Sequence, residues 1–229
     1  MKIFIYLITF FLLISCSAET EQEILSKLND ISFGIPKEKV RLIPDGESLI
    51  SIPVGNKKNL PLLLVFGGIS YANPQFMIEQ IPSVFFEKSV IITVPCTVQG
   101  GKGFRNYLNY FQKKLKKDGI IINKISVCGF SAGGPDALNA VDASDVKIIG
   151  LIDPNPYISS TKLTKANIIT AYNKNNWHDN TEPLKQNMLN KFGDYAKWTK
   201  ERGGIVEENS VQHIIFPKYF FYKYRNKLL

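Results

Sequence analysis

A single serine lies between two glycines at the point where an apolar run of the sequence ends. The stretch reads ISVCGFSAGGPDAL over residues 125–138, and the serine between its glycines is Ser131. Gly129 and Gly133 carry no side chain, so the backbone there can reverse sharply enough to hold a serine in a strained, exposed position. A hydroxyl presented in this way could attack a carbonyl carbon if a base accepts its proton. The pattern therefore predicts a nucleophile.

Two further groups would complete such a nucleophile: a histidine that acts as the base and a carboxylate that orients the histidine. The sequence contains two histidines, His178 and His213. The candidate carboxylates are Asp153, in the stretch IIGLIDPNP, and Asp179, in the stretch NKNNWHDN. The residue types alone leave both choices open.

The elements that must position these side chains can be read from apolar runs of strand length. They are KVRLI (39–43), SLISIPV (48–54), PLLLVF (61–66), SVIITVP (89–95), ISVC (125–128), VKIIGLID (146–153) and NIITAY (167–172). The last five lack polar alternation, which is typical of strands buried on both faces. Helical patterns lie between most of them, at 104–117, 132–141 and 182–202. This alternation predicts an α/β fold: a mostly parallel central sheet flanked by helices on both faces.

The surroundings of Ser131 resemble the G-x-S-x-G nucleophile elbow of the α/β-hydrolase superfamily, because the pattern follows a predicted strand and precedes a predicted helix. The resemblance covers about residues 40–229. It implies the superfamily strand order, in which 61–66 lies between 89–95 and 125–128. It also implies a serine hydrolase. The alternative is a glycine turn with a structural role only.

The same resemblance implies positions for the oxyanion donors and the base. In the superfamily one donor is the residue after the nucleophile, here Ala132, and another lies in the loop after an earlier strand. That loop resembles LLLVFGGISYANP (62–74), with Gly68 as the expected donor, although Gly-Gly also ends strands in other α/β proteins. The superfamily histidine follows the last strand, so we expect His213 to be the base and His178 to lie in a loop.

The choice of the acid departs from the usual pattern. The superfamily commonly places its carboxylate after the strand that corresponds to 167–172, but asparagines follow here, and an amide does not stabilise an imidazolium as a carboxylate does. Asp153 ends the strand after the predicted elbow helix and resembles the Leu-Asp-Pro stretch of pancreatic-type lipases. We expect Asp153 to be the acid. The alternatives are that it only caps the turn at Pro154, or that Asp179 serves.

The implied strand order has a consequence for the cysteines. One strand would separate Cys96 from Cys128, which exceeds the roughly 7 Å that a disulfide allows between Cα atoms, so we expect both thiols to be free. We interpret Cys128 as a small buried hydrophobe rather than a nucleophile.

Only residues 154–166 separate two predicted strands, which is too short for a helical cap, so we expect an open site.

The first fifteen residues are typical of an export signal, with Lys2 before a long apolar block. LISC (13–16) resembles the bacterial lipoprotein box, which implies cleavage before Cys16 and a lipid on its thiol. An ordinary cleaved signal is the alternative. We expect a signal peptide at 1–15, a lipid-anchored tether with a short helix at 16–38, and one hydrolase-like domain at 39–229. The protein would then be an exported, membrane-anchored lipoprotein on the periplasmic or cell-surface side.

The hydrophobic content and the charge of the chain bear on its size and on the partners it could bind. The chain has 229 residues, 45% of them hydrophobic, which suffices for one sizeable core. Lys and Arg number 28 against 20 Asp and Glu, and many of the cations lie in the helical patterns at 111–119 and 216–229. These cations could favour an anionic membrane surface, or they could simply be a solvated face. No motif indicates a nucleic acid, a cofactor or a metal.

Two functions from different classes remain. The first is a membrane-anchored serine hydrolase that cleaves an ester, or alternatively an amide, of a small molecule or a lipid. The second is a non-catalytic lipoprotein that uses a hydrolase scaffold as a binding or structural module, since a fold alone fixes no chemistry. The presence of Ser131, Asp153 and His213 in this order favours the enzyme.

Overall fold

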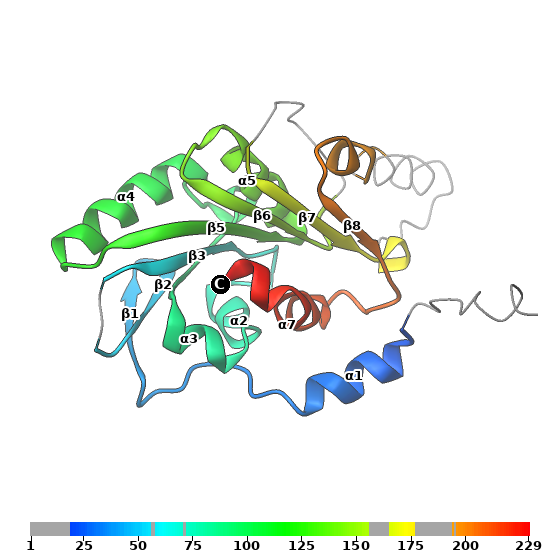
Figure 1. Cartoon of the computed structure of the whole chain (residues 1–229), viewed down its shortest axis with the longest axis horizontal. Coiled ribbons are helices and arrows are strands. Elements are labelled where there is room, and N and C mark those ends of the chain that lie inside the picture. Colours follow the sequence, from blue (N-terminus) through cyan, green and yellow to red (C-terminus); the bar gives the residue numbers. More distant parts are fainter. Residues whose placement is uncertain (1–18, 56–57, 71, 156–164, 177–193, 195) are drawn as a thin grey trace, which may run out of the picture.

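The computed structural model describes residues 19–55, 58–70, 72–155, 165–176, 194 and 196–229. Their centre is an eight-stranded sheet in the order β1-β2-β4-β3-β5-β6-β7-β8 (Figure 1). The strands are β1 (Val40–Asp45), β2 (Ser48–Pro53), β3 (Leu60–Phe66), β4 (Val90–Val94), β5 (Ile122–Phe130), β6 (Val146–Ile152), β7 (Asn167–Tyr172) and β8 (Ile205–Glu208). β1 and β2 pair antiparallel with their neighbours, and every other pairing is parallel.

The strand order confirms the sequence-based expectation, since β3 lies between β4 and β5. The apolar runs explain why these strands are central. All five residues of β4 are buried, and Leu62 to Phe66 of β3 are 1% exposed or less. Side chains on one strand alternate between the two faces of the sheet, so a continuous apolar run needs cover on both faces.

Helices cover both faces, as the sequence predicts (Figure 1). They are α1 (Glu21–Asn29), α2 (Pro74–Glu79), α3 (Ser83–Lys88), α4 (Phe104–Lys117), α5 (Gly134–Leu138) and α7 (Phe216–Leu228). Leu62 and Leu64 belong to a core cluster that includes residues of α4 and α5. Leu63 and Val65 belong to a second cluster with α2, α3 and α7. The period of two along β3 thus separates the core into two layers.

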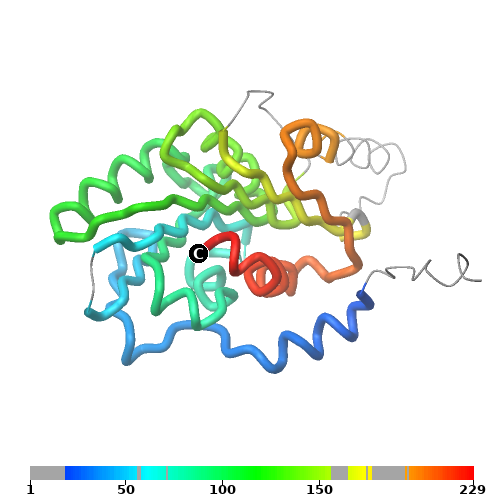
Figure 2. Tube along the Cα trace, viewed as in Figure 1, coloured from blue at the N-terminus to red at the C-terminus, as the bar shows by residue number. Residues whose placement is uncertain are grey.

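The helix α1 packs against α7, and the two lie side by side in the tube view (Figure 2). Ile24 and Leu28 are its buried residues, one helical turn apart. A capping box begins the helix: the Thr20 side chain accepts from the Glu23 N–H, and the Glu23 carboxylate accepts from the Thr20 N–H. The short helix expected in 16–38 is therefore present and docked on the domain.

Among the described residues, the helices α2 and α3 and the strand β8 were not predicted from the sequence. The helix expected at 132–141 is instead three short pieces, a 3₁₀ turn at Ser131–Gly133, α5, and a 3₁₀ turn at Asn139–Asp142. Pro135 in the first turn of α5 and the paired glycines before it account for the irregular start. β5 continues to Phe130, two residues past the predicted strand end.

Several predictions fall outside the described residues. These concern the signal peptide and Cys16, the histidine His178, the rival acid Asp179, most of the helix expected at 182–202, and most of the segment 154–166 that should lack a cap. Within the described part of the chain, residues 196–201 are helical. No helix among the described residues is both long enough and apolar enough to cross a bilayer.

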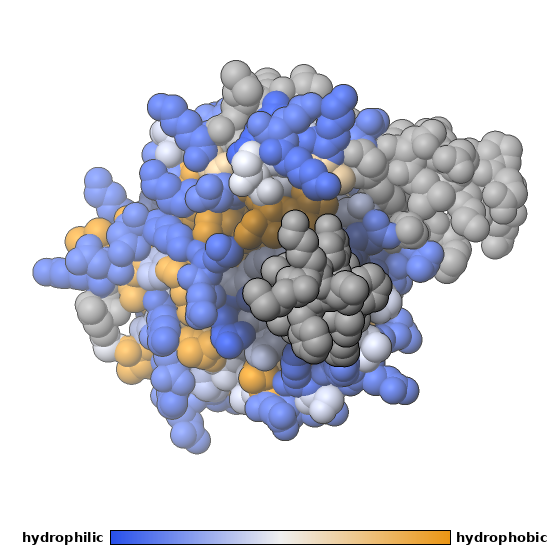
Figure 3. Space-filling view, turned by 45° about the vertical axis from the view of Figure 1, so that its right-hand side comes forward, coloured by the Kyte–Doolittle hydropathy of each residue, from blue (hydrophilic) through white to orange (hydrophobic). Residues whose placement is uncertain are grey.

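Cys96 and Cys128 are both free and buried, as expected. Burial raises the pKa of the Cys128 thiol far above its ordinary value, so the thiolate that a nucleophile requires is suppressed. Hydrophilic side chains cover most of the described surface in the space-filling view, with hydrophobic patches between them (Figure 3). The cations expected to point outward are found on α4, where Lys116 and Lys117 are exposed in its last turn.

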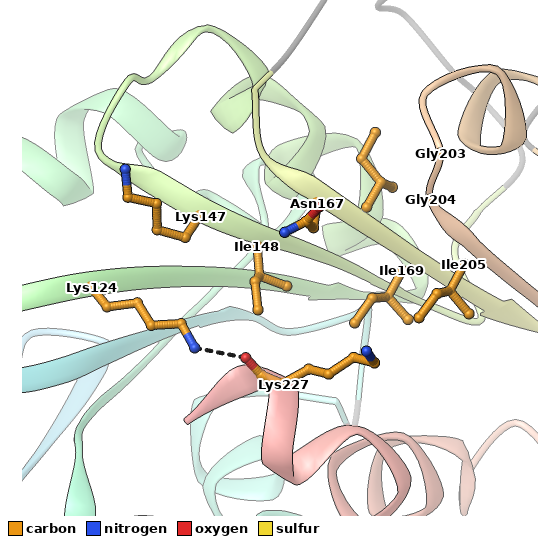
Figure 4. A pocket seen from close by; sticks show the side chains of 10 residues that line it. Lys124, Lys147, Ile148, Asn167, Ile169, Gly203, Gly204, Ile205 and Lys227 are labelled. Carbon is orange, nitrogen blue, oxygen red and sulfur yellow. Dashed lines mark hydrogen bonds between the residues drawn. The ribbon is translucent and has the colours of Figure 1, made fainter.

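The amino edge of the sheet is the side at which the parallel strands begin. A pocket of about 440 Å³ lies there, with Lys124, Lys147 and Lys227 among its lining residues (Figure 4). The Lys124 ammonium donates to the backbone carbonyl of Lys227 at 2.7 Å, and the Ser126 hydroxyl donates to the carbonyl of Leu228 at 3.0 Å. Burial lowers the pKa of Lys124. β5 thereby supplies donors to the last carbonyls of α7, which no helical N–H can reach.

Candidate active site

The nucleophile candidate lies where β5 passes into the first 3₁₀ turn. Ser131 has φ +52°, a left-handed conformation that residues other than glycine rarely adopt. A Cβ on Gly129 would lie 2.0 Å from the Gly133 carbonyl oxygen, and a Cβ on Gly133 would lie 2.4 Å from the Gly67 carbonyl oxygen. Both approaches are too short for any side chain. The two glycines are therefore required by the tight turn, as the sequence pattern indicates.

The two residues predicted as oxyanion donors both lie next to this serine. Ala132 follows it directly and is 5% exposed. A Cβ on Gly68 would lie only 3.1 Å from the Cβ of Ser131, so the loop after β3 contacts the elbow at this residue. The neighbouring N–H of Gly67 donates to the Val94 carbonyl at 2.9 Å, which ties this loop to the end of β4. The fold thus brings Gly68, Ala132 and Ser131 together.

Asp153 and His213 are in direct contact. The Nδ1 atom of His213 lies 2.6 Å from Oδ2 of Asp153. Asp153 is fully buried, whereas the imidazole side chain is 25% exposed. A buried carboxylate that holds Nδ1 leaves Nε2 as the atom that can accept a proton. Asp153 also has φ +37°, the second strained residue of this group.

Two contacts join this pair to the elbow. The imidazole ring of His213 packs on the ring of Phe130, which precedes the serine, with ring centroids 4.5 Å apart and planes inclined by 30°. The backbone N–H of Asn155, two residues after the aspartate, donates to the Ser131 carbonyl at 2.8 Å. The loops after β5, β6 and β8 are thereby held together at the carboxyl edge of the sheet.

The loop after β7 supplies further partners for the carboxylate. The backbone N–H of Asn173 donates to Oδ1 of Asp153 at 2.9 Å, and the side-chain amide of Asn176 donates to Oδ2 at 2.7 Å. The sequence pattern predicts no role for these asparagines, because their acceptors lie on the loops after β6 and β8.

A buried aspartate outside the predicted set fixes the loop after β4. Asp136 lies in α5, is 2% exposed, and accepts from both the N–H and the hydroxyl of Thr97 at 2.8 Å each. Burial raises the pKa of this carboxyl, although the two hydrogen bonds oppose the shift. Asp136 thus clamps the elbow helix to a neighbouring loop, and we assign it a structural role.

No protein-family model matches this sequence, and no curated protein matches it. Solved structures do resemble it. An acylaminoacyl peptidase from Pyrococcus horikoshii superposes with a TM-score of 0.53 at 13% identity over 82% of this chain. An IroE-like serine hydrolase from Shewanella oneidensis also gives 0.53 at 13% identity, covering 80% of this chain and 77% of its own. The chain has the α/β-hydrolase fold.

This chain spans only 40% of the length of the Pyrococcus peptidase, so the likeness concerns one part of that protein. At such low identity the comparison establishes the fold, and the site must be argued from its own geometry. Within the α/β-hydrolase sheet, Asp153 follows β6, and asparagines occupy the position after β7 where the superfamily commonly has its acid.

Proposed function

We propose that this chain is a serine hydrolase that cleaves an ester bond through an acyl-enzyme on Ser131. The observation that supports it most is the 2.6 Å contact between His213 and the buried Asp153, beside an elbow whose serine is held at φ +52°. Strained residues and fully buried carboxylates are costly, and they concentrate at sites of chemistry. A scaffold that had become purely structural would gain stability by losing them.

In the first half of the proposed reaction, Oγ of Ser131 attacks the carbonyl carbon of the ester while its proton moves to Nε2 of His213. The carbonyl oxygen becomes negative and accepts hydrogen bonds from the N–H groups of Gly68 and Ala132. The tetrahedral intermediate then expels the alcohol. The bond between the carbonyl carbon and the alcohol oxygen breaks, and that oxygen takes the proton from the imidazolium.

In the second half, water attacks the acyl carbon of the ester formed with Ser131, and one of its protons moves to His213. The intermediate collapses, the bond to the serine oxygen breaks, and the proton returns to that oxygen. The products are one carboxylic acid and one alcohol, with the enzyme restored. Throughout, Asp153 holds the imidazole in one tautomer and stabilises its positive charge.

The N-terminal sequence supports a further part of the proposal, that the enzyme is exported and anchored to a membrane by lipid on Cys16. Its basis is the signal-like segment 1–15 and the LISC pattern. A single acyl chain binds membranes weakly, whereas several chains anchor a protein stably. Cys16→Ser should leave the precursor uncut or release the protein from membranes. An unmodified N-terminus downstream of Cys16 in the wild-type protein would refute this part.

The test of the chemistry uses the full-length chain in mild detergent and a fluorophosphonate probe, which forms a covalent bond with activated serines. We expect the wild-type protein to be labelled at Ser131 and to hydrolyse p-nitrophenyl esters of graded acyl length. Neither labelling nor hydrolysis by a folded wild-type protein would contradict the proposal and favour the non-catalytic binding module. Amides tested in parallel distinguish the two bond types.

A further inference from the structure

The acid of the proposed triad stands in an unusual place, so something must hold it against the histidine. Asp153 directly follows the strand β6, whereas His213 lies beyond β8, and the strand β7 separates β6 from β8 in the sheet. A contact of 2.6 Å between side chains on such separate loops requires that the loops be fixed relative to each other. The residues that lie between them belong to the loop after β7.

One side-chain amide joins the two loops directly. The Nδ2 group of Asn176 donates to Oδ2 of Asp153 at 2.7 Å and to the carbonyl oxygen of Val211 at 2.9 Å. An amide NH₂ group has two protons, so both bonds can form at once. The first acceptor is the same oxygen that contacts His213, and the second lies two residues before His213 in the chain. Asn176 therefore spans the acid and the segment that carries the base.

Neighbouring residues orient this amide. Asn173 is 4% exposed, and its side-chain amide donates to the Asn176 side-chain oxygen at 3.3 Å and to the Val211 carbonyl at 3.0 Å. Because its amide oxygen accepts from Asn173, Asn176 presents its two N–H bonds to Asp153 and Val211. The segment before the base is fixed from its other side as well, where the Val211 N–H donates to the side chain of Asn209 at 3.0 Å.

We propose that Asn176 is the positioning residue of the Asp153–His213 pair, and that its side-chain amide keeps the acid and the base in contact across the loops after β6, β7 and β8. It does not touch the reacting atoms. The proposal rests on the proposed function for its catalytic meaning, but the geometric claim concerns the protein without substrate. A small displacement of a catalytic group can cost about 100-fold in rate, so the loss of this link should be visible in kcat.

The chain supplies a matched control in the adjacent residue. Asn175 is exposed, and its contact with the network is its backbone N–H, which donates to the Asn173 side chain at 2.9 Å. Asn175→Ala removes the same side chain from the same loop and keeps that backbone donor. With p-nitrophenyl acetate as substrate, we expect Asn176→Ala to lower kcat by about 10- to 100-fold with little change in KM, and Asn175→Ala to leave both unchanged.

A third variant separates hydrogen-bond donation from packing. Asn176→Leu keeps the approximate size and shape of the side chain but has no NH₂ group that can donate to Asp153 or Val211. If donation matters, Asn176→Leu should lose about as much kcat as Asn176→Ala. If Asn176 merely fills space, Asn176→Leu should keep the kcat of the wild type, and that result would overturn the proposal.

A measurement without substrate completes the test. In full-length protein in detergent, the proton between His213 Nδ1 and Asp153 should give a far-downfield NMR signal that His213→Gln removes. We expect Asn176→Ala to weaken or shift this signal and Asn175→Ala to preserve it. An unchanged signal in Asn176→Ala refutes the positioning role. A wild-type protein that shows the signal but neither hydrolyses p-nitrophenyl acetate nor reacts with the fluorophosphonate would instead refute the proposed function alone.

Discussion

The two edges of the sheet are built differently although the same strands form both. At the carboxyl edge, Ser131 and Asp153 have positive φ angles, and the buried Asp153 carboxylate is surrounded by donors. At the amino edge, Lys124 and Ser126 make ordinary hydrogen bonds to the last carbonyls of α7. Strained residues cost about 1–3 kcal/mol each, whereas a satisfied helix end stabilises. We infer that the first edge is built for reaction and the second for stability.

The sharpest test of this comparison uses Ser131 at the carboxyl edge and Ser126 at the amino edge. Ser131→Ala should abolish ester hydrolysis and probe labelling, because the covalent step depends on that one oxygen. Its free energy of unfolding should stay within about 0.5 kcal/mol of wild type, since a partly exposed hydroxyl contributes little. Steady-state kinetics and urea denaturation measure the two effects. An active Ser131→Ala protein would refute the mechanism.

The next largest effect is expected at the acid. Asp153→Asn should lower kcat by about four orders of magnitude with little change in KM, because an amide at this position orients the imidazole in the wrong tautomer. Asp179→Asn should be mild and serves as the comparison. The reverse ranking would move the acid to the loop after β7. Small, equal effects from both would remove the triad and favour a binding module.

A partly buried carboxylate on the last strand should affect stability in a defined pH range. Glu207 on β8 accepts from the hydroxyls of Tyr219 and Tyr224 and from Lys223 of α7. Burial opposes its ionisation, but these hydrogen bonds outweigh burial and lower its pKa below the ordinary value of 4.5. A lowered folded-state pKa stabilises the protein above the unfolded value, and this contribution is lost as the pH falls through the folded value.

Glu207→Gln should therefore destabilise the protein by about 2 kcal/mol near pH 7, the size expected for hydrogen bonds to a charged group. The difference from wild type should shrink below about pH 4.5, where the wild-type carboxylate becomes protonated. Urea denaturation of both proteins near pH 7 and near pH 3 measures it. A difference that is the same at both pH values would show that the charge contributes nothing.

The smallest expected effect lies at the amino edge. Ser126→Ala removes a buried donor and leaves the Leu228 carbonyl without that hydrogen bond, which should cost about 1 kcal/mol of unfolding free energy. Esterase activity at a temperature where the variant is folded should equal that of wild type. The two variants should therefore give opposite results. Ser126→Ala should lower stability and keep activity, whereas Ser131→Ala should abolish activity and keep stability. A loss of activity in folded Ser126→Ala would contradict the division between the edges.

The sequence alone determined the parts of this protein that depend on local pattern. Continuous apolar runs predicted buried parallel strands, because such residues need cover on both faces of a sheet. The elbow was readable because Gly129 and Gly133 lack a Cβ, which in this turn would lie 2.0 and 2.4 Å from a carbonyl oxygen. The resemblance to the α/β-hydrolase superfamily implied the strand order and the position of Gly68 near the serine. The sheet has the implied strand order.

Other features were decided only by the tertiary structure. The sequence left Asp153 and Asp179 as rival acids, because a carboxylate reaches an imidazole through the folding of separate loops and not through spacing along the chain. The roles of Asn173 and Asn176 were invisible for the same reason, since their acceptors lie on the loops after β6 and β8. Local residue patterns predict where a strand ends and where the chain reverses at a serine. Only the packing of the whole sheet brings its loop ends within hydrogen-bonding distance.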